Sequence, residues 1–183
     1  SDVYKRQIHR GLGGTGVVGI IRGDQPGERA VGLRADMDAL PMQEANTFDH
    51  ASKHEGKMHA CGHDGHTAML LAAARYLSQH RDFAGTVYVI FQPAEEGGGG
   101  AKRMIDDGLF TRFPMEAVFG MHNWPGMKPG QFGVTAGPIM ASSNEFSIVV
   151  KGKGTHAGMP NLGIDPVMAA VQLAQSLQTI ITR

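Results

Sequence analysis

The chain has 183 residues, 42% of them hydrophobic, and 17 basic side chains balance 17 acidic ones. This length allows one full hydrophobic core with a small second unit. The zero net charge argues against a nucleic-acid partner, and no apolar run reaches the length of a membrane-spanning helix. The single cysteine cannot form an internal disulfide, which fits a reducing compartment, so we expect a cytoplasmic protein without membrane or nucleic-acid partners.

Both ends of the sequence have the character of a piece cut from a longer chain. Residues 1–7, SDVYKRQ, join no helical or strand pattern and resemble a translated adapter, so we set them aside as a cloning or assembly scar. Residues 165–183 have the spacing of an amphipathic helix and reach the last residue without a C-cap signal. We therefore expect a longer parent protein; the alternative is a natural protein of this length.

The first half of the chain predicts two strands, a loop and a helix. Short β-branched runs favour strands over 17–21 and 30–34, separated by a glycine- and proline-containing turn. The polar residues 43–57 have no hydrophobic period and predict a loop. The alanine-rich stretch 67–80 predicts a helix that ends near His80.

The next segments continue the alternation of strands and helices. Residues 86–92 are almost all apolar, as expected of a strand buried on both faces. Residues 98–107 predict a helix that is stopped by Gly108, and residues 117–121 predict another short buried strand. This alternation indicates an α/β fold whose sheet contains parallel pairs.

The pattern changes near Ala141, where we expect a domain boundary. Residues 144–151 alternate between apolar and polar side chains, which predicts a strand with one exposed face. A long helix is predicted from Asp165 onward. The sequence therefore predicts a first domain over 8–140 and the beginning of a second, α+β domain over 141–183.

Metal-binding side chains are concentrated in residues 59–66, HACGHDGH, which contain three histidines, an aspartate and the only cysteine. Thiolate, imidazole and carboxylate groups are the ligands of zinc and similar divalent ions. Cys61 and His63 can bind one metal, or two adjacent metals, from a single loop. Alternatively, Cys61 is a small buried apolar residue. For His66 we favour a bond to the backbone or to a carboxylate, or a role in steadying a ligand.

Further polar side chains follow directly after three predicted strands: Asp36 and Asp38, Glu95 and Glu96, and His122. In open α/β sheets, ligands bind beyond the carboxyl ends of the strands. We therefore expect these side chains to converge on one site.

Adjacent carboxylates at a strand end can divide two tasks between them. We assign Glu96 as a metal ligand and Glu95 as the general base that takes a proton from an attacking water. The alternative is that both are ordinary loop acids. Asp38 can orient a ligating imidazole or stabilise a turn, and His122 can be a ligand or a hydrogen-bonded core histidine.

His156 lies between glycines in the stretch GKGTHAG and is expected to be exposed. It either faces solvent or donates a hydrogen bond to an oxyanion of a substrate.

Five motifs carry a resemblance to a known family. They are GLRADMDALP at 32–41, MHACGHDGHT at 58–67, FQPAEEG at 91–97, GMHNWP at 120–125 and GKGTHAGMP at 152–160. Together they resemble the aminoacylase, hippurate hydrolase and carboxypeptidase metallopeptidase family. The similarity is greatest to its amidohydrolase branch, which includes hippurate hydrolases and indole-acetyl-amino-acid hydrolases.

The resemblance implies a zinc-peptidase-like mixed sheet flanked by helices, with two divalent metal ions, which can be Zn, Mn, Ni or Co. It implies a lid domain that mediates formation of a homodimer. By motif match, Glu95 would be the general base and His156 would reach the active site of the other subunit. The implied metal ligands are Cys61, His63, Glu96 and His122. The family's further histidine ligand falls beyond residue 183, so we expect this chain's site to lack it.

The resemblance also implies the reaction. We expect the parent protein to hydrolyse the amide bond of small N-acyl amino acids, such as N-benzoylglycine or N-acetyl amino acids. The alternatives are a dipeptidase or carboxypeptidase of the same family and an inactive metal-binding fragment. A phosphate binder is disfavoured because neither glycine run, 11–16 or 97–100, has the residues that phosphate loops require.

Overall fold

The computed structural model describes residues 8–142 and 144–180. The chain divides into two compact units, one reaching to Pro129 and the other starting at Gly130. The expected scar at 1–7 and the last three residues of the predicted C-terminal helix lie outside the described residues. The domain assignment, 8–140 and 141–183, stays a prediction.

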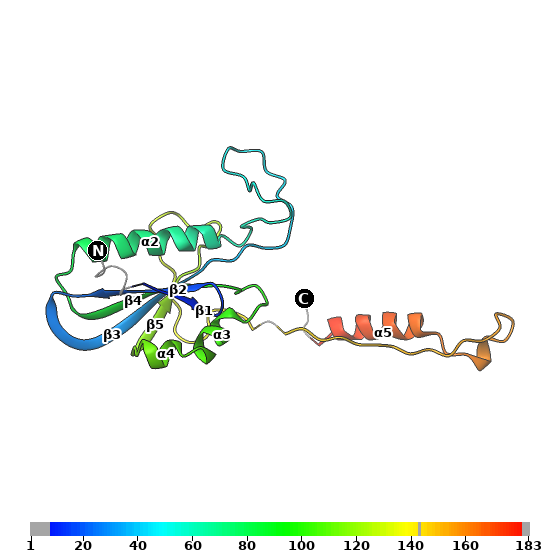
Figure 1. The fold of residues 1–183 in the computed structure, drawn as a ribbon. Helices are drawn as coiled ribbons and strands as arrows, with labels where there is room; N and C mark the ends of the chain where they lie inside the picture. Colours follow the sequence, from blue (N-terminus) through cyan, green and yellow to red (C-terminus); the bar gives the residue numbers. More distant parts are fainter. Residues whose placement is uncertain (1–7, 143, 181–183) are drawn as a thin grey trace. The chain divides into compact units, whose positions relative to one another are not determined.

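A five-stranded mixed sheet forms the centre of the first unit (Figure 1), in the order β1-β2-β4-β3-β5. Its strands are β1 (Ile8–Leu12), β2 (Gly16–Arg22), β3 (Gln25–Asp36), β4 (Ala84–Gln92) and β5 (Ala117–Gly120). The pairs β1–β2 and β2–β4 are antiparallel, whereas β3 is parallel to both β4 and β5. The predicted α/β sheet with parallel pairs is confirmed.

Helices cover both faces of this sheet. In Figure 1, α2 (His63–Gln79) lies on one face, and α3 (Gly100–Asp106) and α4 (Leu109–Arg112) lie on the other. The prediction for β4 is confirmed, because its alternate side chains enter two separate cores. Ile90 packs with Leu12, Val18, Met104, Leu109 and Phe113. Val87, Val89 and Phe91 pack with Ala35 and Leu70.

Two strands differ from the predictions. β1 was not predicted, because its sequence, IHRGL, has few apolar residues and contains a glycine; it forms because it pairs with β2. The strand predicted at 117–121 is present as β5, but the prediction that it is buried is wrong. β5 occupies the edge of the sheet, and the side chain of Phe119 is 59% exposed because β5 pairs only with β3 within the described residues.

Glycines mark the start of α2 and the stop after α3. Gly62 precedes α2 in the left-handed conformation, with φ 81°, so the helix begins at His63, inside the histidine-rich motif. The predicted end of α2 is confirmed, since its C-cap is His80. The predicted stop of the next helix is also confirmed, since Gly108 follows α3 with φ 90°.

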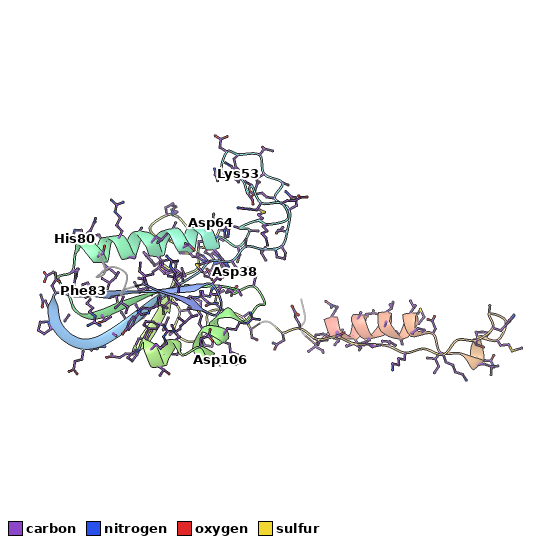
Figure 2. The ribbon with its side chains drawn as sticks, viewed as in Figure 1. Asp38, Lys53, Asp64, His80, Phe83 and Asp106 are labelled. Carbon is purple, nitrogen blue, oxygen red and sulfur yellow. The ribbon has the colours of Figure 1, made fainter. Side chains whose placement is uncertain are left out.

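The start of α2 lies at the carboxyl end of β3. Figure 2 shows Asp38, which comes two residues after β3, near Asp64 in the first turn of α2, whereas His80 and Phe83 lie at the other end of the helix. The chain from β3 through α2 to the parallel strand β4 is a βαβ unit. This connection puts the helix N-terminus beside the ends of the strands.

The second unit contains a short 3₁₀ helix, η1 (Pro160–Leu162), and one α-helix, α5 (Pro166–Gln178). The predicted start of α5 is confirmed: Asp165 is the N-cap, and its side chain accepts a hydrogen bond from the Val167 N–H. The predicted strand at 144–151 is wrong. An extended segment needs a partner for its backbone groups, and the described part of this unit has only an isolated bridge between Lys153 and Ile164.

Among the described residues, none of the helices combines the length and the apolar character needed to cross a membrane.

The core on the α3 and α4 face predicts a stability difference between two phenylalanines. Phe113 is 2% exposed and packs under α4, whereas Phe132 is 76% exposed. Phe113→Ala should lower the free energy of unfolding by about 3–5 kcal/mol because it leaves a cavity. Phe132→Ala should change it by less than about 1 kcal/mol. Denaturant unfolding followed by circular dichroism measures both; equal effects would contradict this assignment of the core.

Candidate metal centre

A buried imidazole lies at the centre of the site. His63, the first residue of α2, is 1% exposed. Its Nδ1 lies 3.3 Å from Asp38 Oδ1, and its Nε2 lies 3.7, 3.8 and 4.0 Å from carboxylate oxygens of Asp36, Glu96 and Glu95. None of these approaches forms a hydrogen bond, and neither ring nitrogen has a partner among the described residues. Because buried polar groups are normally satisfied, this ring needs a further partner.

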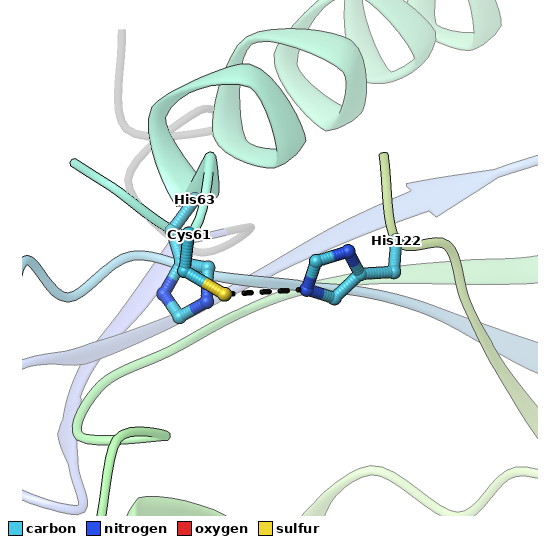
Figure 3. Close-up of side chains that lie close together, drawn as sticks. All are labelled: Cys61, His63 and His122. Carbon is cyan, nitrogen blue, oxygen red and sulfur yellow. Dashed lines mark hydrogen bonds between the residues drawn. The ribbon is translucent and has the colours of Figure 1, made fainter. Parts of the chain in front are cut away.

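Cys61 and His122 lie against this imidazole from two different segments (Figure 3). Cys61 is in the loop before α2, and His122 follows β5. The Sγ atom of Cys61 is 3.4 Å from His122 Nε2. The other ring nitrogen, Nδ1, is 2.7 Å from the Asn123 carbonyl oxygen, which turns Nε2 toward the thiol. One potential ligand atom from each of Cys61, His63 and His122 lies within 4.8 Å of the others.

The two glutamates complete a second group of potential ligands. Glu95 and Glu96 follow β4, after Ala94, whose φ of 50° is unusual for a residue with a side chain. Ligand atoms of His63, Glu95 and Glu96 also lie within 4.8 Å of one another. The Glu96 N–H donates to Asp38 Oδ2 at 3.0 Å, which ties this turn to the end of β3. His63 therefore belongs to both groups, and the expected convergence of the strand ends is observed.

The electrostatics of the site favour a cation. Burial raises the pKa of the Cys61 thiol, and hydrogen bonding to Glu96 and the nearby carboxylates raise it further. Burial acts in the same direction on Asp38, but the backbone N–H groups of Glu96 and Glu95 outweigh it and hold its pKa below the ordinary value. Ionised carboxylates beside a thiol and imidazoles form a donor set for a divalent metal ion.

A buried hydrogen-bond network supports these side chains from behind. His66 Nδ1 is 2.6 Å from Asp36 Oδ1, and Arg34 donates to Asp36 Oδ2 at 2.8 Å. The favoured interpretation of His66, a bond to a neighbouring carboxylate, is confirmed. Asp36, His63 and His66 form a third possible metal-binding group, but both oxygens of Asp36 are already engaged by His66 and Arg34.

One participant in this network was not predicted from the sequence. The Oδ1 atom of Asn123 lies 2.9 Å from His66 Nε2. The only signal in the sequence is that Asn123 follows His122 within the same motif.

His156 belongs to the second unit. Its ring Nδ1 accepts a hydrogen bond from the Gly158 N–H at 3.1 Å. In a neutral ring the proton is then on Nε2, which leaves Nε2 free to donate. His156 is exposed, as expected from its glycine-rich surroundings.

The pairing of Asp36 predicts a pH-dependent stability. Burial alone would raise its pKa, but the hydrogen bond from His66 and the charge of Arg34 outweigh burial and lower the pKa from 3.8. Because the folded pKa is below the unfolded one, the contribution of Asp36 is fully present above about pH 4 and is lost as the pH falls through the lowered value.

Asp36→Asn should therefore destabilise the metal-free protein near neutral pH by about 1–3 kcal/mol, and the difference from wild type should shrink in acid. Denaturant unfolding in the presence of a chelator at several pH values measures this. Asp49→Asn, on an exposed loop, is the control and should stay within about 0.5 kcal/mol of wild type. A difference for Asp36→Asn that stays constant down to acid pH would contradict the interpretation.

Comparison with known proteins finds a hydrolase and a deacetylase among the curated proteins that are similar to this chain. It is 48% identical over 177 residues to a hippurate hydrolase of Campylobacter jejuni, covering 97% of this chain and 46% of that protein. It is 48% identical over 170 residues to an N-acetylcysteine deacetylase of Bacillus subtilis, covering 92% of this chain and 44% of that protein. The chain thus spans less than half the length of these curated relatives.

A solved structure is also similar to this chain. A dinuclear metal-binding peptidase of Bacillus subtilis, from the M20 family, matches with a TM-score of 0.66 at 40% identity, covering 75% of this chain and 41% of that one. The family model of peptidases M20/M25/M40 matches residues 32–182, which include the strand ends, the histidine-rich motif and His156. The chain belongs to the peptidase family M20/M25/M40.

Proposed function

We propose that this chain provides the metal site of a hydrolase that cleaves the amide bond of N-acyl amino acids. The observation that carries the proposal is the buried His63 ring, which has no hydrogen-bond partner among the described residues and is shared by two groups of potential ligands. The two overlapping groups place enough donor atoms in one site that they would hold two divalent ions near each other.

Cys61, His63, Glu96 and His122 would hold these ions. The mixture of thiolate, imidazole and carboxylate suits Zn, Mn, Ni or Co, so the donor set fits the two divalent metals. Bound metal would supply Lewis acidity, which polarises the substrate carbonyl and makes water a better nucleophile at neutral pH.

Glu95 would move the proton. Its Oε2 lies 4.0 Å from His63 Nε2, at the margin of the donor group, and its side chain is more exposed than that of Glu96. A carboxylate in this position can take a proton from the attacking water and deliver it to the nitrogen of the leaving amine. The neighbouring Glu96 is fixed through its backbone by Asp38, as a ligand requires.

The substrate class is supported by the relatives. A hippurate hydrolase and an N-acetylcysteine deacetylase both have names that indicate N-acyl amino acids. N-benzoylglycine and N-acetyl amino acids are therefore the first substrates to test, with a dipeptide in parallel because the family also includes peptidases.

We further propose that the second unit is the start of a lid domain through which a cytoplasmic homodimer forms. His156 would donate from Nε2 to the oxyanion that develops during amide hydrolysis, and in a dimer it would serve the other subunit. The hydrogen bond from Gly158, which leaves the proton on Nε2, supports this role.

Metal content tests the proposed site directly. After incubation with Zn²⁺ or Mn²⁺ and removal of free metal, elemental analysis should find two ions per chain. Cys61→Ala should lose at least one of them, because the thiolate is a ligand. His80→Ala, which removes an exposed histidine at the far end of α2, should bind as much metal as wild type. Equal metal content in Cys61→Ala and wild type would contradict the proposal.

Glu95→Gln tests the role of the general base. It should keep the metal content of wild type and reduce amine release from N-benzoylglycine by about 10²–10⁴-fold, the usual contribution of a positioned base. Glu28→Gln, at an exposed position of β3, should keep wild-type activity. Undiminished turnover by Glu95→Gln would exclude the mechanism. Metal uptake without turnover in wild type would instead support a metal-binding chain that is inactive by itself.

A further inference from the structure

Asn123 connects the two segments that carry Cys61 and His122. Its side-chain Nδ2 donates to the carbonyl oxygen of Gly62 at 3.2 Å. Its backbone N–H donates to His66 Nε2 at 2.9 Å, and its side-chain Oδ1 lies 2.9 Å from the same ring nitrogen. A single residue after β5 thus contacts both the loop before α2 and the first turn of that helix.

The position of Gly62 makes this connection close. Gly62 has φ 81°, and a Cβ atom on it would lie 2.2 Å from Asn123 Nδ2. Such a contact would force the Asn123 side chain, or the backbone that carries it, to move away from Gly62. The glycine therefore allows the amide of Asn123 to lie directly against the backbone between Cys61 and His63.

The far side of the connection is anchored in the sheet. His66 is buried, and its Nδ1 lies 2.6 Å from the buried carboxylate of Asp36, which in turn accepts from Arg34. Through His66, Asn123 is thus attached to the end of β3. A shift of the segment after β5 relative to β3 would break a hydrogen bond of His66 to Asn123 or to Asp36. Breaking a buried hydrogen bond lowers stability.

These contacts act on the distance between two proposed ligands. Cys61 precedes Gly62, His122 precedes Asn123, and the Sγ and Nε2 atoms of the ligands are 3.4 Å apart. We propose that Asn123 is a positioning residue that holds Cys61 and His122 at the separation one metal ion requires. The proposal rests on the proposed metal site, and it assigns Asn123 no contact with metal or substrate.

Cobalt binding provides the first test. Co²⁺ bound to a thiolate gives a charge-transfer absorption, so titration reports both affinity and the Cys61–metal bond. Asn123→Ala should weaken Co²⁺ binding by about 10–100-fold, the range for residues that orient metal ligands, and reduce the charge-transfer intensity at saturation. Asn123→Asp should not restore binding, because a carboxylate cannot donate to the Gly62 carbonyl.

The matched control is Asn46→Ala. Asn46 also donates from Nδ2, to Glu44 Oε1 at 2.9 Å, but it lies in the exposed loop before α2. Its loss should leave cobalt affinity and absorption unchanged. A merely structural role of Asn123 would lower the denaturation midpoint in chelator without changing the absorption of the saturated protein.

A second measurement needs no metal. In chelator, the rate at which Cys61 reacts with a small disulfide reagent should rise in Asn123→Ala, because the loop is released, and stay unchanged in Asn46→Ala. Gly62→Ala should also raise the rate at which Cys61 reacts, because the added Cβ displaces the Asn123 side chain. In the double variant, removal of the Asn123 side chain relieves the clash, so the effects of the two substitutions should be less than additive.

The outcomes separate this proposal from the metal site itself. If wild type binds no Co²⁺ but Asn123→Ala accelerates the thiol reaction, the metal site is wrong and the connection through Asn123 stands. If wild type binds Co²⁺ and Asn123→Ala matches Asn46→Ala in both measurements, the metal site stands and the positioning role is overturned.

Discussion

The parallel pairing of β3 with two neighbours is the constraint on which the site depends. Parallel strands end at the same edge of a sheet, so β3, β4 and β5 bring Asp36, Glu95 and His122 to one place although they are far apart in sequence. The βαβ connection adds the N-terminus of α2, which contributes His63. Each segment supplies one or two side chains. The distances between these side chains therefore depend on how the strands pair and where α2 begins.

The local charge follows from this assembly. Four carboxylates, from Asp36, Asp38, Glu95 and Glu96, surround the ring of His63. Arg34 partly neutralises Asp36 from behind, while the ring itself forms no hydrogen bond among the described residues. Buried polar atoms that are left unsatisfied cost stability, so an unsatisfied buried ring calls for a functional explanation. Burial and, to a smaller extent, the nearby carboxylates raise the pKa of the Cys61 thiol, and the negative charge of those carboxylates favours binding of a divalent cation.

The sequence predicts the features that depend on residues close together in the chain better than the contacts between distant residues. The acids after strands 30–34 and 86–92 could be placed because apolar runs mark the strands and ligand sites follow strand ends. The bond of His66 to a carboxylate was expected for a histidine at a helix start. By contrast, the contact of Asn123 with Gly62 joins residues 61 positions apart, and no local pattern indicates it.

The errors have a common physical cause. The apolar run at 117–121 and the alternation at 144–151 describe side chains, whereas burial and strand formation depend on neighbours. β5 lies at an edge, and residues 144–151 have no strand beside them within the described part of the second unit. β1 shows the converse, because its unremarkable sequence forms a strand once β2 is available as a partner.

The exposed edge of the sheet has a practical consequence. Among the described residues, no strand pairs with the outer side of β5, where Val118 and Phe119 are exposed. Such an edge is a template onto which another strand can add. Two copies meeting at this edge would extend the sheet from one molecule into the next. Work with the isolated chain therefore calls for dilute solutions and for light scattering alongside every titration, so that self-association is not counted as ligand binding.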